Sequence, residues 1–282
     1  MLSPLYPVQV KKILRASGLA GFLLCLALIH AVPLSADQLA VKYKEGSLHG
    51  FLVLKSAEGD TLAAGDLTQG VVGDRVTVKL AFRFKDGSSL EETSIFTQRG
   101  IFRLLSDHLI QKGPAFKRPM DVLTNCSTGQ VTVHYTDDDG KEKTTTERVK
   151  LTSDAANGIV FTLMKNIRDE TQKTTLSMLV ATPKPRLVKL IITPEGDDSF
   201  SVAGFEHKAM RYDVKVDIGG AAGLVAPIIG KQPPDTHIWI ARGDAPIFLK
   251  SEGPMYEGGA IWRIELASPV WPQTASGDSP KK

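Results

Sequence analysis

Apolar and polar residues alternate along much of this sequence, and this period of two constrains the fold more than any other feature. Between Arg75 and Phe84 every second residue is apolar, and most of the intervening residues are polar or charged. Successive side chains of a strand point to opposite faces, so the pattern predicts an antiparallel strand with one buried and one solvated face. The same alternation recurs at 131–135, 210–218 and 262–266.

Short turn sequences separate these segments. The Asp-Gly pair at Asp86 and Gly87 is typical of a tight hairpin, and the run from Asp137 to Gly140 predicts a second turn followed by an exposed strand over 141–149. We therefore expect one long meandering antiparallel sheet. Further strands are expected near 38–44, 49–55, 60–66, 101–112, 174–182, 186–193, 198–206, 235–242 and 246–251.

One segment has a helical pattern instead. From Ser153 to Ile167 the sequence offers a serine cap, and Ile159, Leu163 and Ile167 recur at helical spacing on one face. A large sheet has an apolar face that must be covered. The expected fold class is thus mainly β, a large curved antiparallel sheet (a half-barrel) packed around one central helix.

The N-terminus has the three parts of a secretory signal peptide: a basic start, a short apolar run over 19–32, and small residues before Asp37. Residues 1–36 are interpreted as this signal, with cleavage after Ala36 or, alternatively, Ala31. An apolar run of this length falls short of the roughly 20 residues that span a bilayer. The expected location is periplasmic or secreted; an uncleaved inner-membrane signal anchor is the alternative.

Without the signal, the chain carries no net charge. The whole sequence has 34 Lys and Arg against 31 Asp and Glu, and three of the basic residues lie within 1–36. No basic excess remains to attract a polyanion, so nucleic acid is not an expected partner. The only cysteine left, Cys126, cannot form an internal disulfide and is predicted to be a buried, small apolar residue.

A single β-rich domain is expected over 37–270, and a disordered tail over 271–282. Within the domain, the stretch from Gly219 to Asp235 is rich in glycine and apolar residues and is predicted to be a loop between strands. Because an apolar loop usually covers something, this loop is a candidate lid over the open side of a curved sheet.

Four stretches, 96–108, 181–186, 226–235 and 252–263, resemble segments of a family of uncharacterised exported bacterial proteins. They read FTQRGIFRLLSDH, ATPKPR, APIIGKQPPD and EGPMYEGGAIWR. The resemblance implies a bacterial envelope or secreted protein. In the order of its elements the chain is also similar to the half-barrel of periplasmic lipoprotein carriers, which implies a curved sheet wrapped around a helix.

No catalytic or metal site is expected from the sequence. It has no HExxH, CxxC, GxSxG or phosphate-loop pattern, and the aspartates at 137–139 lack the remaining ligands of a calcium loop. No cofactor is predicted. His108 and His134 are the first candidates if a dispersed hydrolase site assembles from distant positions.

The preferred interpretation is a non-enzymatic binding protein for a lipid, an acyl chain or another apolar small molecule. An envelope assembly or scaffold protein that binds protein partners is the first alternative, and a hydrolase is the second. The residues predicted to line the apolar site are Leu224, Val225, Ile228, Ile229, Trp239 and Phe248.

Overall fold

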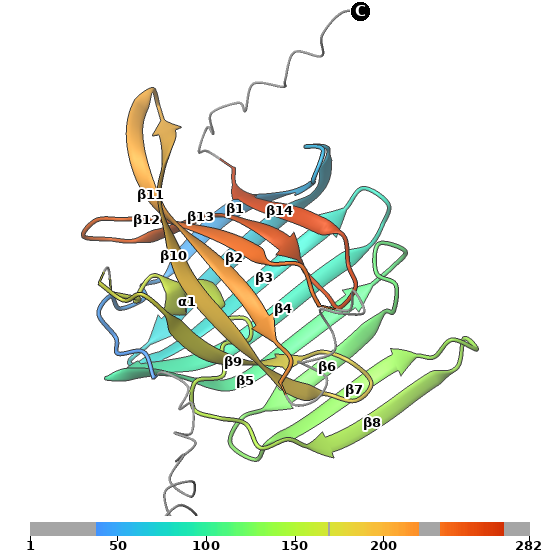
Figure 1. The fold of residues 1–282 in the computed structure, drawn as a ribbon. Coiled ribbons are helices and arrows are strands. Elements are labelled where there is room, and N and C mark those ends of the chain that lie inside the picture. The colour runs from blue at the N-terminus through green and yellow to red at the C-terminus, as the bar shows by residue number, and fades with distance from the viewer. Residues whose placement is uncertain (1–37, 169, 220–231, 268–282) are drawn as a thin grey trace, which may run out of the picture. The chain divides into compact units, whose positions relative to one another are not determined.

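The computed structural model describes residues 38–168, 170–219 and 232–267, and strands dominate this part of the chain (Figure 1). Its fourteen strands form one sheet in the order β8-β7-β6-β5-β4-β3-β2-β1-β14-β13-β12-β11-β10-β9. Every neighbouring pair is antiparallel. The prediction of a mainly β fold built on one antiparallel sheet is confirmed.

The bounds of the strands follow the alternation closely. They are β1 (Leu48–Ser56), β2 (Thr61–Val72), β3 (Arg75–Phe84), β4 (Ser89–Arg99), β5 (Ile101–Lys112), β6 (Met120–Asn125), β7 (Gln130–Thr136), β8 (Glu142–Arg148), β9 (Thr174–Val180), β10 (Arg186–Val202), β11 (Phe205–Asp217), β12 (Thr236–Ala241), β13 (Ile247–Pro254) and β14 (Ile261–Leu266).

Both predicted Asp-containing turns are present. The backbone amide of Ser88 donates to Asp86 Oδ1 at 2.9 Å, and Gly87 has the positive φ of 86° that a side chain would disfavour. At the second turn the backbone amide of Lys141 donates to Asp137 Oδ1 at 2.9 Å. Strand β8, which follows this turn, is almost entirely exposed, as predicted.

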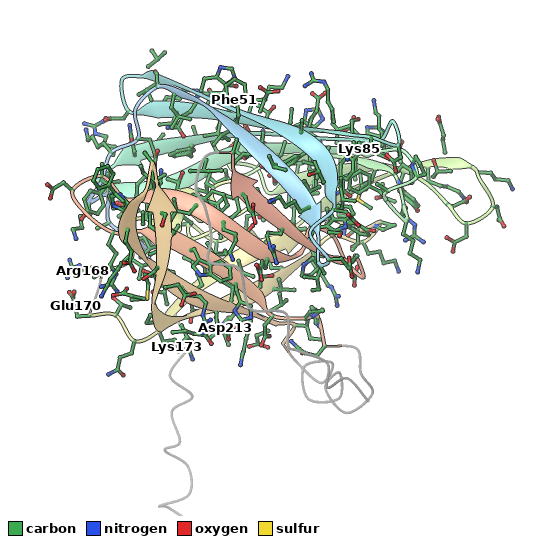
Figure 2. The ribbon with its side chains drawn as sticks, turned by 90° about the horizontal axis from the view of Figure 1, so that it is seen from above. Phe51, Lys85, Arg168, Glu170, Lys173 and Asp213 are labelled. Carbon is green, nitrogen blue, oxygen red and sulfur yellow. The ribbon has the colours of Figure 1, made fainter. Side chains whose placement is uncertain are left out.

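The main hydrophobic cluster lies on the inner face of the sheet. Leu54, Phe82, Phe96 and Ile192 are each at most 1 % exposed, although they come from strands far apart in the sheet order. Contacts between such distant strands require the sheet to curve until its inner face packs against itself. Side chains on the other face point outward, as Phe51 does at 61 % exposure (Figure 2).

The helix is much shorter than the sequence predicts. Helix α1 covers only Val160–Met164, and its N-cap is Ile159 rather than Ser153. The predicted first turn instead runs beside β9, where the amide of Ala156 donates to the carbonyl of Ser177 at 2.8 Å. Gly158, with a φ of 39°, then changes the chain direction just before the helix. Residues 154–157 therefore lie along the edge of β9, where Ala155 makes an isolated bridge to Ser177, instead of starting a helix.

The predicted apolar face of the helix is nevertheless buried. Ile159, Leu163 and Ile167 are 2–6 % exposed and belong to the main cluster. Their spacing correctly identified the residues that fill the interior, but it overestimated how many of them are helical. A five-residue helix and its flanking turns are enough to plug the space that the sheet encloses.

Both edges of the sheet come close to other parts of the fold. The Asn157 side chain bonds the backbone amide and carbonyl of Leu179 at 2.9 and 2.7 Å, which holds residues 154–157 against the outer edge of β9. The turn after β9 lies near β8, since Thr145 Oγ1 donates to the carbonyl of Pro183 at 3.0 Å. A second apolar cluster, Val122, Val131, Val133 and Leu179, joins β9 to β6 and β7.

Three expected strands differ from the structure. No strand forms near 38–44, where Ala40 makes only an isolated bridge to Ile101. The strands expected over 186–193 and 198–206 are largely one, because β10 continues for 17 residues and its turn falls at Ala203 and Gly204. A bulge near Pro194 carries β10 past the residues that suggested a break.

The predicted signal segment, residues 1–36, and the predicted tail over 271–282 lie outside the described residues. All described residues belong to one compact unit, Ala36–Lys282. Within that part of the chain, no helix has the length and apolarity needed to cross a membrane.

Gly158 offers a test of this packing. A Cβ at Gly158 would overlap Ser94 Oγ, and the positive φ adds backbone strain. We expect Gly158→Ala to lower the free energy of unfolding by about 2–4 kcal/mol in urea titrations. Gly140→Ala is the matched control, because Gly140 also has a positive φ but has open space around it, so its loss should stay near 1–2 kcal/mol. Equal losses would contradict the close packing at Gly158.

Candidate functional site

The structure describes two of the six residues predicted to line an apolar site. Leu224, Val225, Ile228 and Ile229 lie outside the described residues, so the lid remains a prediction. Trp239 and Phe248 are described, but they belong to different hydrophobic clusters on opposite faces of the sheet. Phe248 lies opposite Ile240 across the β12–β13 pair, and a register shift separates that pairing from the one made by Trp239.

Trp239 belongs to a small cluster on the outer face, with Phe200, Ala209 and Leu249. Its indole Nε1 donates to Asp198 Oδ2 at 2.7 Å, and Lys250 Nζ lies 3.9 Å from the centre of its ring. A tryptophan with a satisfied N–H and a cation over its face is well anchored. Its role here is to hold β10, β12 and β13 together.

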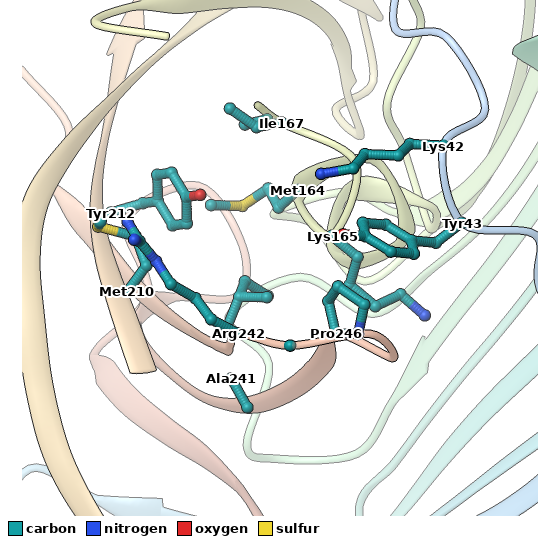
Figure 3. A pocket seen from close by; sticks show the side chains of 12 residues that line it. Lys42, Tyr43, Met164, Lys165, Ile167, Met210, Tyr212, Ala241, Arg242 and Pro246 are labelled. Carbon is teal, nitrogen blue, oxygen red and sulfur yellow. The ribbon is translucent and has the colours of Figure 1, made fainter. Parts of the chain in front are cut away.

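Phe248 points into the interior and stacks on Phe161 of α1, with ring centroids 4.0 Å apart. This contact fixes the short helix against β13. Beside it, a small pocket of about 50 Å³ lies between α1 and the strands β11 and β12 (Figure 3). Phe248 is one of the two predicted lining residues that the structure describes, and it belongs to the interior cluster next to this pocket.

The pocket combines an apolar floor with a cationic rim. Met164, Met210 and Ile240 line it from the interior, whereas Lys42 and Arg242 reach it from the chain before β1 and from the turn after β12. Figure 3 shows the Lys42 ammonium pointing towards Met164. Both rim cations also have contacts within the fold: Arg242 Nε lies 3.5 Å from Asp197 Oδ1, and Lys42 Nζ lies 4.8 Å from the centre of the Tyr43 ring. The pocket thus places cationic side chains next to an apolar floor.

A buried polar network supports one side of this pocket. Lys165 Nζ lies 2.5 Å from Glu45 Oε1, and the Glu45 side chain is only 5 % exposed. Gln69 donates to the same carboxylate at 3.0 Å, and Gln98 accepts from the Glu45 backbone amide at 2.6 Å. A charge buried this deeply requires such partners. The network fixes the residues before β1 on the inner face of β2 and β4.

Two carboxyl groups lie together deeper in the interior. Ser94 Oγ donates to Asp107 Oδ1 at 2.6 Å, and Ser94 and Asp107 are paired across β4 and β5. Burial, followed by the charge of Asp107, raises the pKa of Glu92 to about 8, against the lowering effect of a hydrogen bond from the Gly158 backbone. Burial likewise raises the pKa of Asp107 to about 6. With these pKa values, Glu92 keeps its proton at neutral pH, whereas Asp107 is mostly ionised there.

Cys126 adjoins this pair. It is half-buried and packs against the main cluster, and burial, followed by the charge of Asp107, raises the pKa of its thiol to about 12. The thiolate is the reactive form, so a thiol with this pKa is a poor nucleophile at neutral pH. Cys126 therefore behaves as a packing residue.

The structure brings His108 and His134 to the same outer surface. His108 Nε2 lies 2.8 Å from Asp121 Oδ1, and His134 Nδ1 lies 2.8 Å from Thr144 Oγ1. Asp121 and His134 are direct partners across β6 and β7, beside an open hollow of about 240 Å³. The arrangement is exposed to water, which weakens the electrostatic stabilisation that hydrolysis requires.

A further group of polar residues was not anticipated from the sequence. Glu195, Asp213 and His237 each place one ligand-type atom within 4.8 Å of the others. They come from β10, β11 and β12, and Asp213 is the direct partner of His237. Glu195 and Asp213 are 18 positions apart in the sequence, and Asp213 and His237 are 24 apart. Separations of this length match no metal-binding motif. The group could have been found only from the pairing of the strands and from the alternation that places Asp213 and His237 on the outer face of the sheet.

Comparisons with known proteins add one structural likeness. No family model matches the chain, and no curated protein matches it. Among solved structures, it is similar to a β-barrel-like protein of domain of unknown function DUF1849 from Brucella abortus. The identity is 9 % and the TM-score 0.47, over 82 % of this chain and 100 % of that chain. A likeness at this level carries no argument about what this chain binds.

The interior acid pair predicts an unusual dependence of stability on pH. The folded state raises the pKa of Glu92 from about 4.5 to about 8. The stability that this shift contributes to the fold is therefore fully present below pH 4.5 and is lost as the pH rises through 8. We expect Glu92→Gln to flatten the decline of Tm between pH 5 and pH 8, and to raise Tm at pH 8 by at least about 2–4 °C.

Glu91→Gln is the matched control for this measurement. Glu91 is the next residue on β4 but is 44 % exposed and pairs with Lys79 at 3.5 Å. Its Tm profile between pH 5 and pH 8 should follow that of the unaltered chain. If both variants gave the same profile, the raised pKa of Glu92 would not be the cause of the decline.

Proposed function

We propose that this chain is an exported, non-enzymatic binding protein for a small apolar molecule with an anionic head, such as a fatty acid. The observation that carries the proposal is the pocket between α1, β11 and β12, where an apolar floor meets a cationic rim (Figure 3). Export is supported by the basic and apolar N-terminal sequence over 1–36.

The chemistry of the pocket favours such an amphiphile. A carboxylate at the rim would meet Lys42 and Arg242, and at Arg242 it would compete with Asp197, whose Oδ1 lies 3.5 Å from Arg242 Nε. Charge-assisted hydrogen bonds are among the strongest that a side chain forms. The hydrocarbon would lie against Met164, Met210 and Ile240. Most small-molecule sites share this plan of apolar walls with a few polar groups that fix orientation.

The size of the pocket requires the floor to adjust. Its volume of about 50 Å³ is well below the roughly 300 Å³ of an ordinary ligand site. Two methionines form much of the floor, and their unbranched side chains repack more readily than branched ones. An acyl chain would enter by displacing Met164 and Met210 while its head stays at the rim.

The other functions considered have less support. A scaffold that captures a partner strand would use the outer edge of β8, but this strand carries charged residues of both signs, which disfavour edge pairing. A hydrolase built on His108 and His134 would have its reacting groups open to water. The rim and floor of the pocket favour binding over both.

Titration of the purified chain with a fluorescent fatty-acid analogue tests the proposal. We expect saturable binding that the double substitution Lys42→Ala and Arg242→Ala weakens roughly tenfold, because charge-assisted hydrogen bonds contribute about 1.5–3 kcal/mol. The methyl ester of the same probe should bind both proteins with similar affinity, since it lacks the charge that the rim recognises.

The matched control removes two cations elsewhere. Lys79→Ala and Arg83→Ala change the net charge equally, and both residues lie on the outer face of β3, where they are more than half exposed. This variant should bind the acid as the unaltered chain does. Absence of binding, or equal weakening by both double variants, would contradict the assignment of the head to the pocket rim.

A further inference from the structure

We propose that Glu195, Asp213 and His237 bind a divalent transition-metal ion on the outer face of the sheet, with Zn²⁺ as the best fit. The site is separate from the proposed ligand pocket, because Asp213 lies on the opposite face of β11 from Tyr212, which lines that pocket. Figure 2 labels Asp213 on the outer side of its strand. The proposal therefore does not depend on the proposed function.

The separations of the ligand atoms fit a shared ion. His237 Nδ1 lies 3.6 Å from Asp213 Oδ1 and 3.8 Å from Glu195 Oε2. Both distances exceed that of a hydrogen bond. Zn²⁺ binds imidazole nitrogen and carboxylate oxygen at about 2.0–2.2 Å, so two of its ligand atoms lie roughly 3.2–4.4 Å apart. His237 Nδ1 is thus too far from either carboxylate oxygen for a hydrogen bond, and all three ligand atoms lie within 4.8 Å of one another, which suits a shared cation.

Two of these atoms are buried without a hydrogen-bond partner within the described part of the chain. They are Asp213 Oδ1 and His237 Nδ1. The Asp213 side chain is only 10 % exposed, so water does not readily replace the missing partner. A buried polar atom without a partner destabilises the fold by about 1–3 kcal/mol, and such atoms therefore call for an explanation. A metal ion between the two atoms would satisfy both.

The charges around the group also favour a divalent cation. Arg211 lies near Glu195 and Asp198, at 2.9 and 3.8 Å. Lys215 lies near Asp213 and Asp235, at 3.5 and 3.7 Å. These four carboxylates outnumber the two cationic side chains, so the group has an excess of negative charge before His237 is considered. A divalent cation would offset this excess.

The donor set narrows the identity of the ion. One imidazole nitrogen and two carboxylate oxygens are ligands that Zn²⁺ accepts, whereas Ca²⁺ and Mg²⁺ prefer oxygen ligands alone. The Glu195 and His237 side chains are 32 and 39 % exposed, which leaves a path for entry and room for a coordinated water. Bound there, the ion would link β10, β11 and β12 across the outer face.

Isothermal titration of the chelator-treated full chain with zinc chloride tests the proposal. We expect one Zn²⁺ per chain, and we expect Asp213→Asn and His237→Gln each to weaken binding at least about tenfold. The His237 ring centroid lies 6.2 Å from that of Trp239, so Cu²⁺ at the same site should quench tryptophan fluorescence, and it should do so much less in His237→Gln. Each variant is first compared with the unaltered chain by its Tm.

Two control variants separate coordination from general charge effects. Asp235→Asn removes the same charge beside Lys215 without removing a ligand, and His134→Gln removes an exposed histidine on β7. Both should keep Zn²⁺ affinity within about fivefold, the range of a surface charge. The proposal is overturned if the unaltered chain takes up no Zn²⁺, or if Asp213→Asn and His237→Gln bind it as tightly as the controls do.

Discussion

The curvature of a single sheet is the constraint on which the rest of this structure depends. Its inner face carries an apolar side chain at nearly every second position, and only curvature can bury so many of them against one another. The curved sheet encloses a small interior. The five residues of α1, with Ile159 and Ile167 on either side, fill it. The curved sheet and this short plug thus bury each other's apolar side chains.

The fold accommodates its buried acidic side chains in two different ways. The Glu45 carboxylate has partners on both oxygens, Lys165 on one and Gln69 on the other. Glu92 and Asp107 lie together without a cationic partner of comparable strength, and their pKa values rise. The first solution anchors the segment before β1, whereas the second makes the interior sensitive to pH. On the outer face there is a third arrangement: Asp213 and His237 face each other without a hydrogen bond between them.

The strands and turns could be predicted from the sequence because both follow from local rules. Alternation marks a strand wherever one face is buried, and Asp86-Gly87 marks a turn through its own backbone preferences. The length of the helix could not be predicted, because the pairing of residues 154–157 with β9 is a contact between distant segments. Trp239 and Phe248 were grouped on apolarity alone, and the register shift between β12 and β13, which accompanies their separation onto opposite faces, has no local sequence signal.

Residues 154–157, which lie along the outer edge of β9, also lead directly into α1. This continuity has a consequence for aggregation. Residues 154–157 occupy the edge of β9, and only Gly158 and Ile159 separate them from the helix. A movement that withdraws α1 from the interior would pull this segment away and expose the backbone of an apolar strand. An unprotected edge of that kind pairs readily with a second molecule. The short plug thus also guards the protein against edge-to-edge aggregation.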